Sequence, residues 1–386
     1  MKNKVILIGT NHHNILGLVR SFGVNGIHPD GIIIGDDAAR SFVRKSKYWA
    51  KTWVLSSEDE LIQFMIENYE NEEGKPVVIP CSDSAAAIID LNYNLLMAKY
   101  ILPSINGEQG KIVKLMDKQQ QMEFAKKYKI PMAESFVIET DNVIFPQSIS
   151  YPCIIKPVSS VEGKKSDIKK CENEEEAKKY IEKLKNKGYS RILVQEFVNF
   201  EYEVGFIGAS CKKSAYLINR KKRIWPQIGG SNSFVKKNNN IEVEKFCLNI
   251  LDILRKIGYN GMFDVEIMYT PNAIYLNEIN WRNSGNSFFC LGSDVHYAVV
   301  WYYIITNKKI PYNFKFTCED KKFYAMDESK DIRHVIAGNI SLKRWIQDVK
   351  KSKCFAIWYK KDMKPTIIRY GYLIVEFIRR KGISKS

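Results

Sequence analysis

The chain has 386 residues, of which 45% are hydrophobic and 26% are charged. This length exceeds one ordinary hydrophobic core and predicts two or three globular domains, and the composition excludes an intrinsically disordered chain. The formal net charge of +16 favours anionic partners, without choosing among nucleotides, acidic glycans, nucleic acid and anionic lipid.

Cysteine spacing and the length of apolar runs narrow the class of protein. The eight cysteines are scattered and form neither a Cys-x-x-Cys pair nor a Cys/His ligand spacing, which argues against a zinc site or a disulfide framework. The first residues, MKNKVILIGT, lack the features of a secretory signal, and the longest apolar runs are too short to span a bilayer. We therefore expect a cytoplasmic protein. Because the basic charge comes without a recognisable nucleic-acid-binding module, no nucleic-acid partner is expected.

Residues 1–112 alternate between strand and helix patterns. Short apolar runs at 5–9, 31–35 and 77–80 are separated by amphipathic segments, which is typical of a parallel α/β sheet covered on both faces. Ligands on such sheets lie beyond the carboxyl ends of the strands, where His12, His13 and Asp83 occur. We interpret Asp83 as a helix N-cap and the histidine pair as loop polarity, with substrate contact as the alternative for the histidines.

From residue 113 the pattern predicts two mixed α and β units. Strands end near 157 and 198, and a helix at 243–258 leads into a hairpin at 262–280 with a turn at 270–273. The basic run at 220–223 is interpreted as a solvated strand end. The predicted units are an N-terminal α/β domain (1–112), two α+β subdomains (113–195 and 196–312) and a basic, aromatic C-terminal extension (313–386).

The hairpin gathers oxygen ligands on one face. Alternate strand residues share a face, so Glu278, Asn280 and Arg282 lie together, and Asp264 and Glu266 of the preceding strand face the same side. Uncompensated carboxylates at this spacing repel one another, and Mg²⁺, which prefers carboxylate and amide oxygens, would neutralise them. The guanidinium would hold an anion that the cation also touches. The pattern predicts a metal-bound phosphate, with an ordinary half-exposed edge strand as the alternative.

In chain order, these and further residues resemble the ATP-grasp superfamily over roughly residues 113–312. The resemblance implies that Lys118, at a helix start, and Lys156, in a strand that ends Lys-Pro, bind the nucleotide phosphates. Its implied contacts to adenine and ribose are Glu196, Phe197, Val198 and Glu203. The cofactors it implies are ATP and Mg²⁺, with one or two ions bound and Mn²⁺ as a substitute.

The resemblance also assigns the metal ligands and the catalytic residues. The metal ligands it implies are Glu266, Glu278 and Asn280, with Asp264 as a substitute for the first. Lys156 and Arg282 are the expected catalytic residues, the arginine stabilising an acyl phosphate. The expected substrate contacts are Gly229, Gly230, Ser231, Ser284 and Gly285.

Two features depart from the family pattern. The loop VSSVEGKKSD after Pro157 has Gly163 as its one glycine, where the family is often glycine-rich. Lys164 and Lys165 are candidates for the phosphate contacts there, with solvated lysines as the alternative. Trp281 replaces a familiar proline, and because it faces away from the metal side, we expect it to alter packing more than ligation.

The function implied is that of a carboxylate–amine ligase. The arrangement resembles carbamoyl-phosphate-synthase-like ligases, including D-aspartate ligases and those of surface polysaccharide or cell-wall synthesis, joining a small-molecule or glycan carboxylate to an amine such as an amino acid. One alternative is a bicarbonate-using carboxylase or carbamoyl-phosphate-type synthase, although no biotin-carrier sequence or glutaminase domain occurs. Another is a non-catalytic nucleotide-binding scaffold. The oligomeric state is left open.

The C-terminal segment joins apolar and basic residues. If residues 366–381 are helical, Ile367, Tyr370 and Ile374 lie along one face, and Arg379 and Arg380 gather at its end. We interpret this as a terminal helix docked on the body of the protein. The alternative is peripheral attachment to anionic membrane, at the inner face, which suits an enzyme that modifies a lipid-linked acidic glycan.

Overall fold

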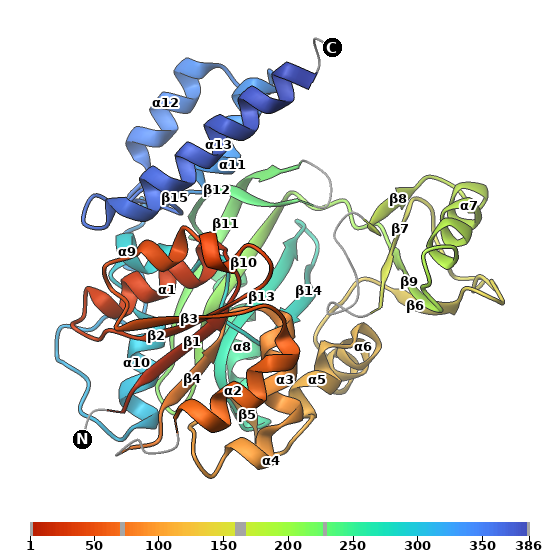
Figure 1. Ribbon diagram of the computed structural model, residues 1–386. Coiled ribbons are helices and arrows are strands. Elements are labelled where there is room, and N and C mark those ends of the chain that lie inside the picture. Colours follow the sequence, from red (N-terminus) through yellow and green to blue (C-terminus); the bar gives the residue numbers. More distant parts are fainter. Residues whose placement is uncertain (1–2, 70–73, 159–166, 227–229, 384–386) are drawn as a thin grey trace.

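The computed structural model describes residues 3–69, 74–158, 167–226 and 230–383, from 376 onward by backbone alone. Its N-terminal part is a four-stranded parallel sheet in the order β3-β2-β1-β4 (Figure 1). Its elements are β1 (Val5–Gly9), α1 (His13–Gly23), β2 (Asp30–Ile34), β3 (Lys51–Leu55), α2 (Leu61–Asn68), β4 (Val77–Pro80) and α3 (Asp83–Leu91).

Uniformly apolar strands form this sheet because helices cover both of its faces. Leu7 and Ile33 pack in one core with α1, whereas Ile6 and Ile32 pack in another with α2 and α3. Successive side chains of a strand point to opposite faces, so both sets must be apolar. The prediction of a parallel sheet covered on both sides is confirmed.

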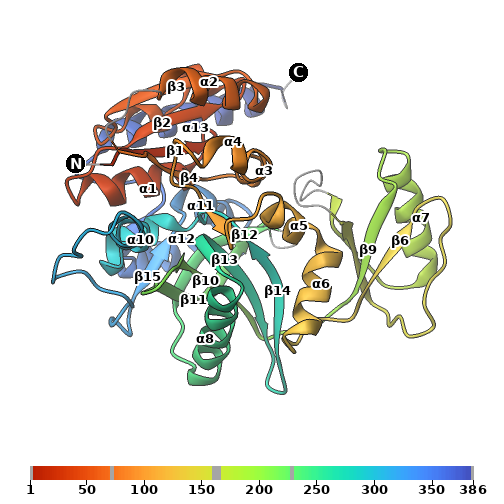
Figure 2. The ribbon, with the colours of Figure 1, turned by 90° about the horizontal axis from the view of Figure 1, so that it is seen from below.

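A second sheet, in the order β6-β9-β7-β8, stands to one side of the molecule (Figures 1 and 2). Its elements are β6 (Ser135–Glu139), β7 (Cys153–Pro157), β8 (Lys169–Cys171), α7 (Glu174–Lys185) and β9 (Arg191–Glu196). Ala177, Ile181 and Leu184 recur at helical spacing on α7 and bury that helix against the strands. The loop between β7 and β8 that holds Gly163, Lys164 and Lys165 lies outside the described residues.

The third sheet has eight strands, ordered β14-β13-β10-β11-β12-β15-β16, with β5 added beside β13. Its antiparallel core is β10 (Tyr202–Ser210), β11 (Ala215–Trp225), β12 (Ser231–Lys237), β13 (Tyr259–Tyr269) and β14 (Ile274–Asn280). Helix α8 (Ile241–Lys256) covers one face, where Val204, Phe206 and Val265 are buried. The alternate residues of the same strands therefore point to the opposite face, which carries the candidate site.

Short elements connect the first sheet to the others, and a C-terminal segment completes the third sheet. The connecting elements are α4 (Tyr93–Leu96), β5 (Ser104–Ile105), α5 (Lys111–Met116) and α6 (Lys118–Lys127). The later elements are α9 (Cys290–Ser293), α10 (Tyr297–Ile305), β15 (Tyr324–Met326), α11 (Glu328–Ile336), α12 (Leu342–Lys351), β16 (Cys354–Phe355) and α13 (Met363–Ile383). Because β15 pairs with β12, the segment after residue 313 continues the sheet of the preceding unit.

The C-terminal segment is also tied to the N-terminal sheet. Arg20 of α1 is fully buried and donates to the Asp362 carboxylate at 2.9 Å and to the Ile357 carbonyl oxygen. In the described part of the chain, no single helix has the length and apolar composition of a membrane span. Residues 287–293 and 297–305 reach those limits only as a pair, bent by 99°.

Candidate active site

The hairpin of β13 and β14 places the predicted metal ligands opposite one another. In the strand register, Glu266 is paired with Glu278 and Asp264 with Asn280. Antiparallel partners share a face, so the four side chains stand on the sheet face that α8 does not cover. Trp281 points the other way. It is buried, and its indole N–H donates to the Leu115 carbonyl oxygen at 3.1 Å, as its expected packing role requires.

Lys118 lies beside this face because its helix, α6, is hydrogen-bonded to β14. Asp117 caps the helix, and Gln121 exchanges two hydrogen bonds with the backbone of Ile279, at 2.9 and 3.0 Å. The Lys118 Nζ consequently lies 3.2 Å from the Glu278 carboxylate. The predicted phosphate-binding lysine and the predicted metal ligand Glu278 are therefore direct neighbours.

Lys156 approaches from the second sheet and is almost completely buried. Its Nζ donates to Gln195 Oε1 at 2.8 Å. Burial, reinforced by the nearby Lys118 cation, lowers the pKa of Lys156 to about 7. Burial alone would raise the pKa of Glu278, but the two lysine cations outweigh it and hold that pKa below its ordinary value. Lys118 therefore contacts the Glu278 carboxylate directly, whereas Lys156 acts on it through its charge and donates its hydrogen bond to Gln195. Two lysines near one site are suited to bind phosphate.

Lys221 also belongs to this cluster, and the sequence analysis missed it. Its side chain is 6% exposed and its Nζ lies 3.1 Å from Glu203 and 3.3 Å from Glu266. Burial opposes the charge, yet the two carboxylates raise the pKa of Lys221 above its ordinary value. The interpretation of residues 220–223 as a solvated strand end is wrong, because Arg223 also forms ion pairs, with Asp331 and Asp348 at 2.7 Å. Strand alternation from Glu203 across to β11 could have indicated Lys221.

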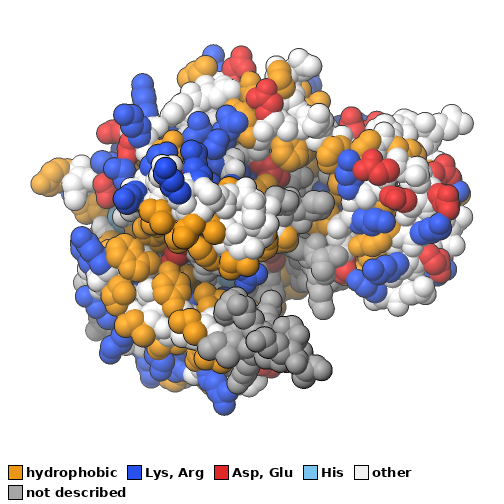
Figure 3. All heavy atoms as spheres, turned by 90° about the horizontal axis from the view of Figure 1, so that it is seen from above, with side chains coloured by type: hydrophobic (Ala, Val, Ile, Leu, Met, Phe, Trp, Pro, Cys, Tyr) orange, Lys and Arg blue, Asp and Glu red, His pale blue; other side chains and the backbone are white. Residues whose placement is uncertain are grey.

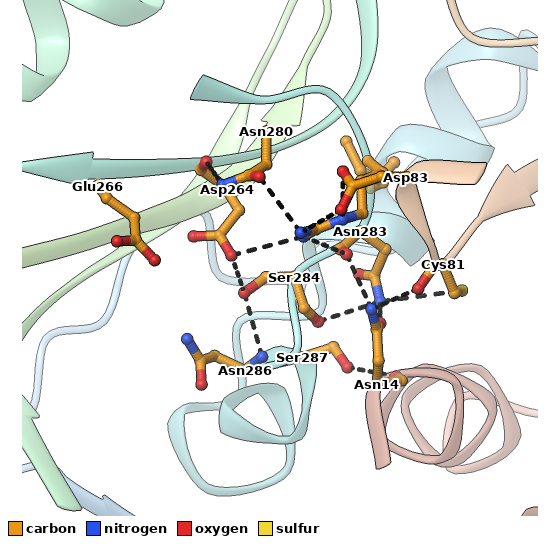
Figure 4. Close-up of polar contacts among 12 residues, drawn as sticks. Asn14, Cys81, Asp83, Asp264, Glu266, Asn280, Asn283, Ser284, Asn286 and Ser287 are labelled. Carbon is orange, nitrogen blue, oxygen red and sulfur yellow. Dashed lines mark hydrogen bonds and ion pairs between the residues drawn. The ribbon is translucent and has the colours of Figure 1, made fainter. Parts of the chain in front are cut away.

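The donor set fits a magnesium ion that also binds phosphate. Within the described residues, no three His, Cys, Asp or Glu side chains converge as a complete metal site. Glu266, Glu278 and the amide of Asn280 supply two carboxylates and one neutral oxygen, and Mg²⁺ commonly takes only one or two carboxylates and completes its shell with water and phosphate. Asp264 is less available, because Ser284 donates to its carboxylate at 2.7 Å (Figure 4).

Space for a ligand lies next to these donors. Gly205 is paired with Glu266 across the sheet, and a Cβ placed on Gly205 would meet no atom within 4 Å. On the other side of Gly205 lies Asn219, whose buried Nδ2 has no hydrogen-bond partner among the described residues. Gly205 therefore leaves room for a polar ligand between Asn219 and Glu266. Such a ligand could accept the hydrogen bond that the buried Asn219 Nδ2 otherwise lacks.

Arg282 does not stand free at the end of β14. Its guanidinium donates to both oxygens of Asp83, at 3.0 and 3.1 Å, and to Asn280 Oδ1 at 3.2 Å. The expectation that Asp83 caps α3 is wrong: Ser82 is the N-cap, its hydroxyl accepting from the Ala85 N–H. Asp83 is turned toward Arg282 instead, because the neighbouring serine already satisfies the helix end.

The predicted adenine and ribose contacts lie on the segment that connects β9 of the second sheet to β10 of the third sheet. Glu196 is exposed at the end of β9, and Phe197 and Val198 are half-buried in the segment that leads to β10. The Phe197 ring lies beneath the Lys170 ammonium, 4.3 Å from its centroid. Glu203, at the start of β10, is joined through Lys221 to the predicted metal ligand Glu266. The structure thus joins the predicted ribose contact to the metal cluster, but it records no direct contact between Glu196 and the cluster.

The predicted substrate contacts separate into two groups. Gly230 and Ser231 line a cavity of about 720 Å³, together with His12 and His13. Gly285 lies beside this cavity, since a Cβ on it would come within 3.9 Å of both histidine rings. Ser284 is fully buried and its hydroxyl donates to the carboxylate of Asp264. Gly229 lies outside the described residues.

The histidines do more than provide loop polarity. His12 caps α1, its side chain accepting from the Asn14 N–H at 3.2 Å, and both rings face the cavity. Burial lowers the pKa of His13 to about 4, so this imidazole is neutral near pH 7. The His12 side chain is more exposed to solvent than His13.

Comparison with known proteins agrees with this geometry. Residues 123–290 match the family model described as the ATP-grasp domain. Formate-dependent phosphoribosylglycinamide formyltransferase of Tolumonas auensis is 25% identical over 170 residues, and that of Wolinella succinogenes 28% over 144 residues. These alignments cover 41% and 35% of this chain and the same shares of the two relatives, so the chain matches well under half of their length.

Solved structures share the fold over most of the chain. N5-carboxyaminoimidazole synthase of Aspergillus clavatus, solved with ADP and 5-aminoimidazole ribonucleotide, has a TM-score of 0.60 at 15% identity, covering 82% of this chain and 80% of that one. L-amino acid ligase of Bacillus licheniformis has a TM-score of 0.59 at 12% identity, covering 80% and 74%. The fold is therefore an N-terminal parallel sheet followed by ATP-grasp sheets. Residues 123–290 are thus similar to the ATP-grasp domain in sequence, and the distant relatives match part of the chain.

Proposed function

We propose that the protein is an ATP-dependent carboxylate–amine ligase that forms an amide and releases ADP and phosphate. The observation that carries the proposal is the contact between Lys118 Nζ and the Glu278 carboxylate at 3.2 Å, on a hairpin that pairs Glu278 with Glu266. Lys156 is buried nearby and its charge acts on the same carboxylate. Phosphoryl-transfer enzymes use cationic side chains to bind the phosphates and carboxylates to hold Mg²⁺, and the two lysines and two glutamates could serve in these roles.

The proposed reaction has two steps. A substrate carboxylate oxygen attacks the γ-phosphorus of ATP, and the bond between this phosphorus and the β,γ-bridging oxygen breaks. ADP departs, and the substrate is now an acyl phosphate. An amine nitrogen then attacks the acyl carbon, phosphate departs, and the nitrogen gives up a proton. Lys118 and Lys156 would hold the phosphate oxygens and offset charge as it develops. Glu266, Glu278 and Asn280 would hold Mg²⁺, which when bound neutralises the triphosphate.

Arg282 would contribute a positive charge whose position is fixed in advance. Because Asp83 holds its guanidinium in a two-point ion pair, the arginine is fixed beside Asn280 without further ordering. Its positive charge near the metal ligands would favour the acyl phosphate. The names of the relatives fit a carboxylate substrate, since one group is formate-dependent and a solved structure is an amino acid ligase. A role in surface polysaccharide or cell-wall synthesis, in the cytoplasm, is part of this proposal.

A bicarbonate-using carboxylase is the second candidate. It is favoured by the shared fold with biotin carboxylase of Campylobacter jejuni, with a TM-score of 0.60 at 13% identity over 80% of this chain and 72% of that one. A nucleotide-binding scaffold is the third, but a scaffold does not require the paired metal ligands.

Release of ADP separates the candidates. The purified protein is incubated with ATP, Mg²⁺ and pools of amino acids and acidic sugars, and in parallel with bicarbonate alone. We expect ADP release that depends on a carboxylate and an amine together, and a loss of about 10²-fold or more in Glu278→Gln. Bicarbonate-dependent release would favour the carboxylase, and ATP binding without any release would favour the scaffold.

A further inference from the structure

The cavity beside Gly285 carries positive charge from outside the ATP-grasp match. Its wall includes Lys330 and Arg333 of α11 and Arg369 of α13, all beyond the matched residues 123–290. Its opposite wall is formed by the ends of the N-terminal sheet and by Ser231. The C-terminal segment thus reaches a space that lies next to the hairpin signature.

The cations of this cavity are only partly compensated. Lys330 lies 3.0 Å from Asp327 and donates to Ser231 Oγ at 2.9 Å. Arg333 and Arg369 have no carboxylate partner in the part of the chain that the structure describes. Arg369 instead sits over the Phe42 ring, 5.5 Å from its centroid. Two guanidinium groups held around a cavity without an acid are suited to bind an anion in two-point fashion.

The remaining surfaces of the cavity do not compete for that anion. The carboxylate of Asp327 is buried and engaged by Lys330, with His13 at 3.9 Å. The neutral imidazole of His13 can donate a hydrogen bond without adding a full charge. Trp225, Ile357 and Leu373 offer apolar contact to the rest of the ligand.

We propose that this cavity binds the non-nucleotide substrate through a carboxylate or phosphate group, and that Arg333 and Arg369 of the C-terminal segment recognise that group. The inference rests on the proposed function, because it places this substrate next to the acyl-phosphate position. It adds that α11 and α13, which lie outside the ATP-grasp match, recognise an anionic group of that substrate.

The test uses the full chain and two probes, inorganic phosphate and malonate, which stand for the two sources of negative charge. Binding is followed by titration calorimetry in wild type, Arg333→Gln, Arg369→Gln and the double variant. Lys245→Gln, which removes an exposed charge from α8, is the matched control. We expect at least one probe to bind, about tenfold more weakly in each single variant and unchanged in the control. The preferred probe identifies the anionic group.

ATP binding is measured on the same samples to check that the nucleotide site is intact. The thermal midpoint of unfolding checks that each variant is folded. Unchanged probe binding in the double variant, or no binding of either probe to wild type, would overturn the inference. These outcomes are distinct from failure of the proposed function, which appears as the absence of ADP release with an intact cavity.

A separate observation concerns the outer surface of the C-terminal helices. Large apolar side chains are exposed there, with Ile336 at 70%, Ile367 at 64%, Ile374 at 60% and Leu342 at 54%. Figure 3, which looks down on these helices, shows hydrophobic side chains gathered beside Lys and Arg. We call the exposed residues of 336–375 the apical face.

The charges of the apical face have one sign. Between residues 341 and 375 the two acidic residues, Asp348 and Asp362, are buried in ion pairs with Arg223 and Arg20. The cations of the same segment are Lys343, Arg344, Lys350, Lys351, Lys353, Lys360, Lys361, Lys364 and Arg369. All but Arg369, which is half-buried, are exposed. Every exposed formal charge in this segment is therefore positive.

We infer that the apical face docks on a bilayer that contains anionic lipid. Exposed isoleucine and leucine side chains enter the interface, and the lysines are attracted to the anionic headgroups. The docked-helix interpretation of α13 also holds for its inner side, because Thr366 is buried and Tyr370 donates to Glu328 at 2.7 Å. One side of the helix packs on the protein and the other remains available.

Flotation with phosphatidylcholine vesicles, with and without phosphatidylserine, tests the docking. Wild type is expected to float with the anionic vesicles at low salt and to lose binding at high salt. The double variant Ile367→Ser/Ile374→Ser is expected to float at least about tenfold less, whereas Ile144→Ser, which changes an isoleucine that is 69% exposed on another part of the chain, behaves as wild type. Substitution is preferred to truncation because α13 also packs on Glu328.

Absence of flotation, or equal flotation with neutral vesicles, would contradict the inference. Light scattering identifies the other occupant: a dimer that the double variant dissociates would assign the apical face to a second copy of the chain and overturn membrane docking.

Discussion

Arg282 and Asp83 form a two-point ion pair, with Nε 3.0 Å from Oδ1 and Nη2 3.1 Å from Oδ2, across 199 positions of sequence. The pair joins the end of the β13–β14 hairpin, which carries the predicted metal ligands, to the first turn of α3 in the N-terminal unit. The N-terminal unit therefore fixes the orientation of the predicted catalytic residue Arg282.

Asp83→Asn should destabilise the protein and reduce turnover. The amide keeps the shape of the carboxylate but loses its charge, so Arg282 would be left with Asp264 at 3.8 Å as its carboxylate neighbour. We expect the free energy of unfolding in urea to fall by about 1–3 kcal/mol. Asp59→Asn, on an exposed neighbouring segment, is the control. Equal midpoints for both variants would mean that the ion pair is not what holds Arg282.

The buried ammonium of Lys156 predicts a pH dependence of nucleotide binding. Its lowered pKa of about 7 means that the free protein loses this cation above pH 7, whereas bound phosphate favours the protonated form. The affinity for ATP should therefore be highest below this pKa and fall as pH rises from 7 to 9. The terminal phosphate of ATP gains little further charge in that range, because phosphate monoesters titrate near about 6.

Titration calorimetry in buffers of different ionisation enthalpy measures the accompanying proton uptake. Wild type should take up a proton on binding ATP at pH 8, and Lys156→Gln should bind more weakly with no uptake and a shallower pH slope. A slope that is the same in both proteins would assign the titration to another group.

Gly205 predicts a graded steric effect. Its missing side chain leaves open space beside Glu266, and a Cβ there would contact no atom within 4 Å. Gly205→Ala should retain ATP binding, whereas Gly205→Val should weaken it at least about tenfold, because the branched side chain fills the position proposed for the ligand. Both changes favour strand structure, so the free energy of unfolding should change by no more than about 1 kcal/mol. Undiminished binding in the valine variant would place the nucleotide elsewhere.

Local patterns predicted the fold and the grouping of the hairpin ligands. Strand alternation alone places Asp264, Glu266, Glu278 and Asn280 on one face and Trp281 on the other, and the register shows that arrangement. The parallel sheet follows equally from its uniformly apolar strands. These features depend on neighbours in sequence, which a single chain displays directly.

Contacts between distant segments could not be predicted in the same way. Strand alternation indicates Lys221 only once the pairing of β11 with β10 is known, because that pairing brings it to Glu203. Strands β15 and β16 have three and two residues, too short to show a period. The cavity that includes His12 and Arg369 exists only because α13 folds back over the N-terminal sheet. Pairing across the chain carries no local sequence signal.

Lys221 and Lys222 are adjacent in sequence but should differ in their contribution to the free energy of unfolding. It is buried between Glu203 and Glu266, whereas Lys222 is exposed on the opposite side of β11. Lys221→Met would leave the two carboxylates without their shared cation, and the expected loss is about 1–3 kcal/mol in the free energy of unfolding. Lys222→Met should change it by no more than about 0.5 kcal/mol.

Magnesium distinguishes an electrostatic cause from a packing cause. If Lys221 neutralises Glu266, then a divalent cation at the proposed metal site can take its place, so millimolar Mg²⁺ should restore part of the lost stability of Lys221→Met while leaving Lys222→Met unchanged. The measurement is urea unfolding of wild type and both variants with Mg²⁺ or with EDTA. A loss that Mg²⁺ does not reduce would show that Lys221 supports the strand by packing, and it would remove Glu266 from the proposed metal ligands.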